Sequence, residues 1–91
     1  MYRLSNTVRS THNQDGAIVL DVRQGQMFNV NIVGSRILEL LKNASTESVI
    51  IDGISREFGV SHDLAENDVR EFLHALKKSH LVEEYEPNVA A

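Results

Sequence analysis

The sequence predicts an α+β fold in which a two- or three-stranded antiparallel sheet is followed by three helices. Three observations predict it. The length of 91 residues suits one domain. Strand signals of period two fill the first third of the chain, and apolar residues at helical spacing fill most of the rest. We place one domain at residues 1–85 and expect residues 86–91, which hold the only proline, to form a frayed tail.

A β-hairpin is predicted over residues 17–31. Residues 17–22 are rich in β-branched side chains, and the two-residue period puts Ile18, Leu20 and Val22 on one face. A short polar turn follows, in which Gly25 can adopt a positive φ. The second strand, 26–31, then has Phe28 and Val30 on one face and Met27, Asn29 and Asn31 on the other. A further strand is expected around residues 7–11.

Three helices are predicted from capping residues and apolar spacing. The expected N-caps are Asn31, then Ser45 or Thr46, then Ser61, and the expected C-terminal residues of the first two helices are Asn43 and Gly59. The apolar positions are Ile32, Ile37, Leu38 and Leu41, then Ile50, Ile54 and Phe58, then Ala65, Val69, Phe72 and Leu76. Leu81 and Val82 are expected to fold back onto the core. A hairpin with three helices is winged-helix-like, and the helices joined around Gly59 are similar to a helix-turn-helix.

The length and composition of the chain limit the functions that it can have. A chain this short buries a modest core and leaves little room for a shaped catalytic pocket. It has no cysteine, no signal peptide and no apolar run long enough to cross a bilayer, so we expect a cytoplasmic protein without a membrane partner. The net charge of −4 opposes nucleic-acid binding and favours partners that carry Lys or Arg.

No motif indicates a reaction or a cofactor. The histidines have no i, i+4 pair and no cysteine beside them, so no metal site is predicted; they are His12, His62, His74 and His80. The acids that open the third helix suit the helix dipole, although a peptide-contacting role stays open. No phosphate-binding loop or nucleophile elbow is present. We therefore predict neither catalytic residues nor a cofactor.

The ordered set of motifs resembles the PqqD family. The hairpin segments are Asp15-Gly16-Ala17-Ile18-Val19-Leu20-Asp21 and Gly25-Gln26-Met27-Phe28-Asn29-Val30-Asn31. The helical segments are Gly34-Ser35-Arg36-Ile37-Leu38-Glu39-Leu40-Leu41 and Asp68-Val69-Arg70-Glu71-Phe72-Leu73 with Leu76, followed by Leu81-Val82. The resemblance covers about residues 7–83. It departs at Ser79-His80, where the family often has glycine, and at Met27, which replaces one member of an aromatic pair.

The resemblance implies a recognition element for ribosomally synthesised, post-translationally modified peptides. Such domains capture the leader segment of a precursor peptide as an added strand, packed against the third helix, and present the precursor to modifying enzymes. The expected strand positions are Gln26, Met27, Phe28, Asn29 and Val30. Helical geometry places Leu64, Asp68, Glu71 and Ala75 on one flank of the stripe that contains Phe72, and Leu73 and Glu66 on the other. We expect the first flank to line the groove, because its two carboxylates suit a basic leader.

The pathway stays open at this stage. A lasso-peptide recognition protein would act with a leader peptidase and an ATP-dependent cyclase. The PqqD protein of pyrroloquinoline quinone synthesis would act with a radical S-adenosylmethionine enzyme. The alternative from another class is a winged-helix DNA-binding regulator, which the acidic first turns of the third helix oppose.

Overall fold

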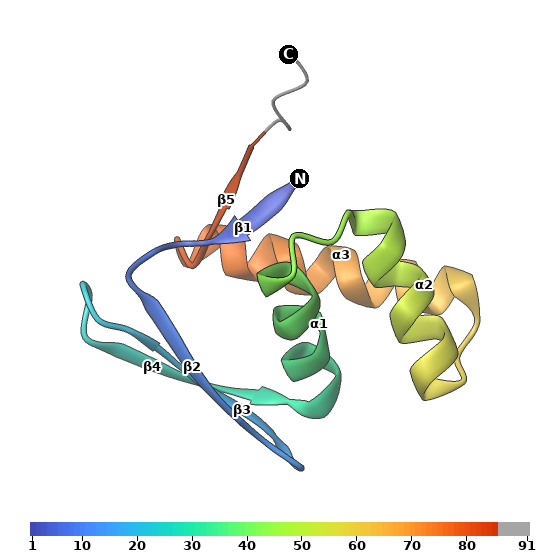
Figure 1. The fold of residues 1–91 in the computed structure, drawn as a ribbon, viewed down its shortest axis with the longest axis horizontal. Helices are drawn as coiled ribbons and strands as arrows, with labels where there is room; N and C mark the ends of the chain where they lie inside the picture. The colour runs from blue at the N-terminus through green and yellow to red at the C-terminus, as the bar shows by residue number, and fades with distance from the viewer. Residues whose placement is uncertain (86–91) are drawn as a thin grey trace.

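A three-stranded antiparallel sheet forms the lower part of the molecule in Figure 1, in the order β2-β3-β4. The computed structural model describes residues 1–85, and the predicted tail at 86–91 lies outside them. The strands are β2 (Val8–Asn13), β3 (Gly16–Asp21) and β4 (Gln26–Asn31). The hairpin and the further strand near residues 7–11 are thus confirmed, and the sheet has three strands.

Three helices follow on one side of this sheet (Figure 1): α1 (Ile32–Lys42), α2 (Glu47–Phe58) and α3 (His62–Lys78). Each begins at a predicted cap, because the side chains of Asn31, Thr46 and Ser61 accept hydrogen bonds from the amides three residues later. Helix α2 ends at Gly59, whose φ of 64° is left-handed. The predicted fold class is confirmed: antiparallel strands followed by three helices.

The inner face of the sheet differs from the face that looks most apolar in the sequence. Ala17, Val19 and Asp21 point inward and are buried, whereas the other alternation, Ile18, Leu20 and Val22, points outward and is 42%, 37% and 58% exposed. Asp21 is buried because it organises the turn to β4. Its Oδ1 accepts hydrogen bonds from the Arg23 amide at 3.0 Å and the Gln24 amide at 3.3 Å.

The core lies where α1, α2 and α3 meet the inner face of the sheet. Two details of the helical stripes differ from the sequence-based expectation. Ile32, at the first position of α1, is 47% exposed, because the buried face of this helix is formed by Ile37, Leu38 and Leu41. In α3 Leu73 is fully packed in the core, and Phe72 is only partly buried at its border.

Two short strands that the sequence analysis missed bring the ends of the described chain together (Figure 1). β1 (Tyr2–Leu4) pairs with β5 (Val82–Glu84) as a separate antiparallel sheet. Leu81 and Val82 are 2% and 4% exposed, so their predicted return to the core is confirmed. Within residues 1–85 no helix is both long and apolar enough to span a membrane.

Candidate functional site

A groove runs along α3, with β4 opposite it at one end and the first turns of α1 opposite it at the other. It consists of two neighbouring hollows, of about 390 and 160 Å³, that share the side chain of Phe72. The larger one is lined by Asn31, Val33, Gly34, Ile37, Asp68, Glu71 and Phe72. The smaller one is lined by Val19, Phe28, Asn29, Val30, Phe72, Ala75, Leu76, Ser79 and Leu81. We call the two together the β4–α3 groove.

The strand beside this groove has an open edge. Within the described part of the chain β4 pairs with β3 alone, through partners such as Phe28 with Val19 and Val30 with Ala17. The Val22 amide donates to the Thr7 carbonyl, so the backbone groups of Val22 and of every second residue before it in β3 point toward β2. The backbone groups of the residues between them, Ala17 and Val19, therefore point toward β4, and those of their partners Val30 and Phe28 point toward β3. The N–H and C=O groups of Met27 and Asn29 therefore face the open edge.

The smaller hollow is an apolar seat. Phe28 and Val30 border it from β4 and Ala75 and Leu76 from α3, with Phe72 at its junction with the larger hollow. Phe28, Val30 and Phe72 are each partly buried against the core, so their positions are fixed by packing. This end of the groove can therefore bury an apolar side chain of a ligand without rearrangement.

The larger hollow adds negative charge. Asp68 and Glu71, one turn apart on α3, line it together with Phe72. Both carboxylates are exposed, and none of the ion pairs formed among residues 1–85 involves them. They are available to a cationic group on a ligand.

Gly34 sets the width of the groove, and the sequence analysis did not assign it to the site. A Cβ at Gly34 would lie 2.9 Å from Phe72 Cε1 and would also collide with the side chain of Val30. Glycine thus lets α1 approach both walls. The signal was present in the sequence, since a glycine inside an amphipathic helix often marks a close approach. Its neighbours Asn31, Val33 and Ile37 were likewise missed as lining residues.

Seven of the ten predicted site residues line the groove and three do not. Those that line it are Phe28, Asn29, Val30, Asp68, Glu71, Phe72 and Ala75. Gln26 is exposed beside the β3–β4 turn, Met27 is exposed on the outer sheet face, and Leu64 is 49% exposed near the start of α3. Met27 alternates with Phe28 along the strand, so only its backbone reaches the open edge.

The opposite flank of α3 is occupied by other contacts. Leu73, which the sequence analysis placed on this opposite flank, is buried in the core and is not free to line a groove. Glu66 is 3.5 Å from Arg70, which also contacts Glu47 of α2 at 3.1 Å. That side of α3 faces α2, and the β4–α3 groove lies on the flank that carries Asp68 and Glu71.

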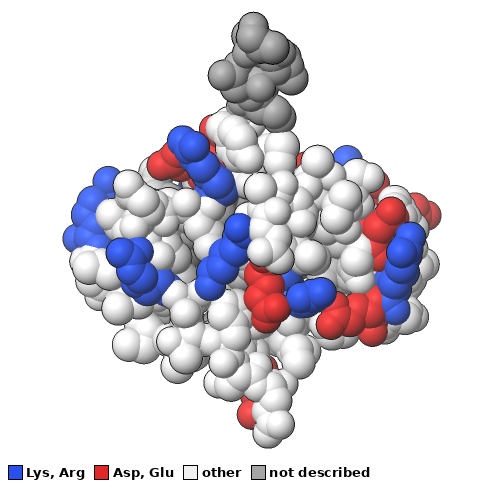
Figure 2. Space-filling view, in the orientation of Figure 1, with Lys and Arg blue, Asp and Glu red and all other residues white. Residues whose placement is uncertain are grey.

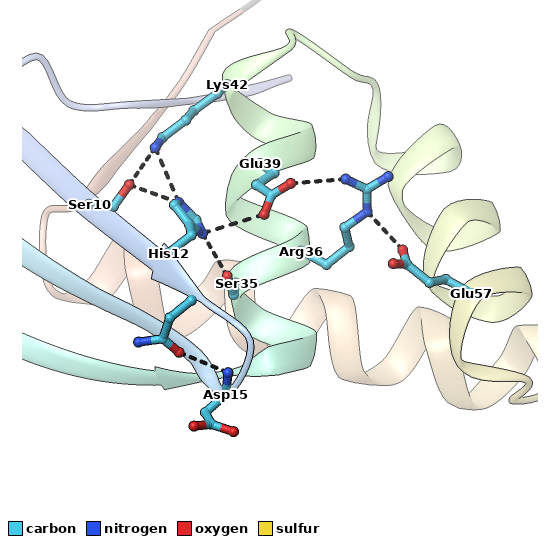
Figure 3. Close-up of polar contacts among 9 residues, drawn as sticks. Ser10, His12, Asp15, Ser35, Arg36, Glu39, Lys42 and Glu57 are labelled. Carbon is cyan, nitrogen blue, oxygen red and sulfur yellow. Dashed lines mark hydrogen bonds and ion pairs between the residues drawn. The ribbon is translucent and has the colours of Figure 1, made fainter.

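The polar contacts around His12 tie the sheet to the helices (Figure 3). His12 contacts Ser35 of α1 through Nδ1 at 2.6 Å and Ser10 through Nε2 at 3.0 Å, and Lys42 also contacts both β2 residues. Glu39 and Arg36 continue the chain of contacts to Glu57 of α2. These interactions give His12 a structural role. Within residues 1–85 no three His, Cys, Asp or Glu side chains are grouped to hold a metal ion.

The family model described as coenzyme PQQ synthesis protein D (PqqD) matches residues 16–82, well over half of the chain. The chain belongs to the PqqD family. The match spans both walls of the β4–α3 groove, from β3 to the residues after α3. PqqD domains are non-catalytic peptide-binding domains, so family membership confirms the prediction that this chain is not an enzyme.

Solved structures with the same fold agree with the PqqD assignment. TbiB1, in complex with the TbiA(beta) leader peptide, is 35% identical over 93% of this chain and 99% of its own, with a TM-score of 0.84. Lasso peptide synthetase B1, complexed with the leader peptide, is 20% identical over 91% and 98%, with a TM-score of 0.81.

A third similar structure is the PqqD truncation of Methylobacterium extorquens PqqCD, described as a stand-alone recognition element for ribosomally synthesised and modified peptides. It is 19% identical over 91% of this chain and 88% of its own, with a TM-score of 0.75. At this identity, as for lasso peptide synthetase B1, the likeness concerns the fold. No match to this chain is found among curated proteins.

Proposed function

We propose that this PqqD-family chain binds the leader segment of a ribosomal precursor peptide and presents the precursor to its modifying enzymes. The observation that carries the proposal is the open edge of β4 beside a groove with an apolar and an acidic end. An extended peptide can use both at once. Support also comes from TbiB1, the 35% identical protein whose structure holds a leader peptide.

The proposed mode of binding is strand addition at β4. The open-edge groups of Met27 and Asn29 would supply the backbone hydrogen bonds, each contributing about 0.5–1.5 kcal/mol net. A few such bonds do not offset the entropy lost when a free peptide is ordered. Side chains of the leader must contribute the rest, and the β4–α3 groove supports that role because Phe28, Val30 and Phe72 are already packed in place.

The chemistry of the groove indicates the kind of leader. Alternate residues of an added strand point to the same face, so one series faces α3. We infer that this series contains an apolar side chain for the hollow at Ala75 and Leu76, and a Lys or Arg within reach of Asp68 and Glu71. A cation fits there, since these two carboxylates are exposed and the domain carries a net charge of −4.

The identity of the modifying enzymes depends on the pathway in which the chain acts. Two of the similar proteins described above are solved with leader peptides, and one is a lasso peptide synthetase component, which favours a lasso pathway. The partners would then be a leader peptidase and a cyclase. A radical enzyme, as in pyrroloquinoline quinone synthesis, is the second candidate, favoured by the description of the family model.

Proline at Asn29 tests strand addition. Asn29→Pro removes an open-edge N–H while leaving the ladder to β3 intact, so leader affinity should fall about two- to tenfold with little change in the melting temperature. Asn29→Ala, which keeps the N–H, is the matched control and should bind nearly as well as the wild type. The measurement is titration of a fluorescently labelled leader peptide.

Proline at Val30 should behave differently. Its N–H points toward Ala17 of β3, so Val30→Pro breaks the sheet itself and also removes a groove side chain. We expect a lower melting temperature together with weaker leader binding. Equal affinity of the wild type, Asn29→Pro and Asn29→Ala would exclude strand addition at β4, even if the leader still binds elsewhere.

DNA binding stays the alternative function, and the geometry gives it little support. The first turn of α3 carries Asp63, and Arg70 of the same helix is engaged by Glu47 and Glu66. A helix that enters the major groove needs free cationic or amide side chains there. We expect no mobility shift of random duplex DNA at low salt.

A further inference from the structure

The outer face of the sheet carries an exposed apolar patch that neither the core nor the proposed leader site uses. Its members come from β3, the β3–β4 turn and β4: Ile18 is 42% exposed, Leu20 37%, Val22 58% and Met27 67%. The register places Met27 directly beside Leu20, so the side chains are contiguous across the two strands. Contiguous exposed apolar patches on small soluble domains commonly mark interaction surfaces.

The charges around this patch are basic, although the domain as a whole is acidic. Arg9 lies beside Leu20 on the outer face, and Arg23 lies in the exposed turn at the end of that face. Neither guanidinium joins an ion pair among residues 1–85; that of Arg9 donates to the backbone carbonyls of Asn6 and Val8. The outer positions of β2, β3 and β4 include no acidic residue. In Figure 2 basic side chains appear on the left, toward the β3–β4 turn, whereas acidic and basic side chains lie side by side on the right, over α2.

The patch is continuous with the proposed leader position. A strand added at β4 would extend the sheet, and its outward side chains would lie beside Met27 and Asn29. A partner seated on the outer face would thus touch the recognition domain and the captured precursor together. The helices cover only the inner face, so they do not obstruct such a partner (Figure 1).

We propose that the outer sheet face, formed by Ile18, Leu20, Val22 and Met27 with Arg9 and Arg23 at its border, docks the peptide-modifying enzyme. The docking surface of the enzyme would be apolar with carboxylates at its rim, matching the two arginines. This inference rests on the proposed function and adds the site of the second partner.

A second copy of this chain fits the patch less well. Four half-exposed side chains cover much less than the roughly 800 Å² per partner of a stable specific interface. A dimer formed through this face would also bring the arginines of both copies to one interface. A transient contact with an enzyme that additionally touches the precursor needs less area from this domain.

The test separates leader capture from enzyme docking. The double variant Ile18→Thr/Leu20→Thr removes the apolar patch on β3, keeps β-forming residues and leaves every groove side chain in place. Val49→Thr, on α2 and 52% exposed, is the matched control for losing an exposed aliphatic side chain. Arg9→Glu tests the charge at the border. The full chain is used with its labelled leader, with the full-length precursor and with the purified modifying enzyme encoded beside its gene.

We expect the double variant and Arg9→Glu to bind the leader within about twofold of the wild type while precursor processing falls on the order of tenfold. Val49→Thr should match the wild type in both assays. Unchanged processing by the double variant and by Arg9→Glu, with leader binding intact, would overturn docking at this face and leave the proposed function standing. A wild-type dimer that the double variant converts to a monomer, with processing unchanged, would assign the patch to a second copy. Failure of the wild type to bind the leader would instead contradict the proposed function.

Discussion

Asp68 and Glu71 give the groove its charge, and a single substitution can distinguish the proposed binding role of Asp68 from a purely structural one. Asp68→Asn keeps the shape of the side chain and removes its charge. If a Lys or Arg of the leader reaches it, affinity should fall by about 1 kcal/mol, or roughly fivefold, and the salt dependence of binding should flatten. Titration of a labelled leader at two salt concentrations measures both effects.

Glu66→Gln is the matched control for Asp68→Asn. Glu66 is on the same helix but contacts Arg70 on the opposite side, away from the groove. Its loss should leave leader binding unchanged. The contrary outcome is that Asp68→Asn lowers the melting temperature while leader affinity and its salt dependence stay as in the wild type. That result would show that Asp68 only stabilises the helix through its dipole and does not belong to the proposed site.

Gly34 and Gly53 offer a second comparison between single residues. Alanine in place of a helical glycine gains up to about 1 kcal/mol of helix propensity. At Gly34 the new Cβ would press on Phe72, 2.9 Å away, and overpacking costs about 1–3 kcal/mol. Gly34→Ala should therefore be neutral to destabilising and should weaken leader binding by displacing Phe72 and Val30.

At Gly53 of α2 the new Cβ would meet only Leu40 Cδ1 at 3.4 Å. Gly53→Ala should accordingly raise the melting temperature and leave leader binding unchanged. Thermal melts and leader titrations of both variants test the comparison. Unaltered affinity of Gly34→Ala would mean that Phe72 does not need its present position.

Among the elements, those with a local signal could be predicted and those that depend on distant partners could not. The helix caps Asn31, Thr46 and Ser61 act within three residues, so the sequence locates them well. The pair β1–β5 joins residues about 80 positions apart in strands of three residues each, which leaves no local period to detect.

The groove was predictable in outline for the same reason. β4 and the acidic flank of α3 could be found from periodicity and from the family resemblance. The contribution of α1 through Gly34 depends on how closely two elements pack. On β3 the more aliphatic alternation lies outside, because the inner positions also include Asp21, which the turn requires. Aliphatic content alone therefore does not identify which face of β3 packs against the core.

The contacts of the β1–β5 pair make the stability of the fold depend on pH, and the direction of this dependence follows from Glu84. Glu84 accepts a hydrogen bond from Tyr2 Oη at 2.8 Å and contacts Lys77 Nζ at 3.0 Å. Lys77 and then Tyr2 lower the pKa of Glu84 below its usual 4.5, while the same hydrogen bond raises the pKa of Tyr2. The unfolded chain thus binds the proton more readily, so these contacts stabilise the fold above about pH 4.5 and are lost as the pH falls through the lowered pKa.

Glu84→Gln removes that dependence. At neutral pH it should lower the melting temperature slightly, since the group is exposed and surface pairs contribute little. The difference between variant and wild type should shrink between pH 5 and pH 3, as protonation removes the charge from the wild-type side chain. A difference that stays constant over this range would show that the charge of Glu84 does not contribute.

At the scale of the whole molecule, three surfaces of one small sheet have different roles. Its inner face builds the core, its β4 edge is the proposed leader site, and its outer face is the proposed enzyme site. A chain of 91 residues has little surface to spare, and this division would let the two proposed partners bind without competing. The helices fix the sheet from one side, and α3 also supplies the second wall of the groove.

Packing alone should hold this molecule together, and the leader rather than a metal should be the ligand that stabilises it. The chain has no cysteine, and within residues 1–85 no ligand cluster for a metal ion is formed. We expect a chelator to leave the melting temperature unchanged in reducing buffer. A leader peptide at a hundred times its Kd should add about 2.7 kcal/mol, because it binds the native state only. For a domain of this size that corresponds to a rise of roughly 10–20 °C. Differential scanning calorimetry with chelator, with leader and with a scrambled leader measures all three. Unfolding by the chelator would reveal a structural metal, and an equal rise with the scrambled peptide would show that binding does not read the sequence of the leader.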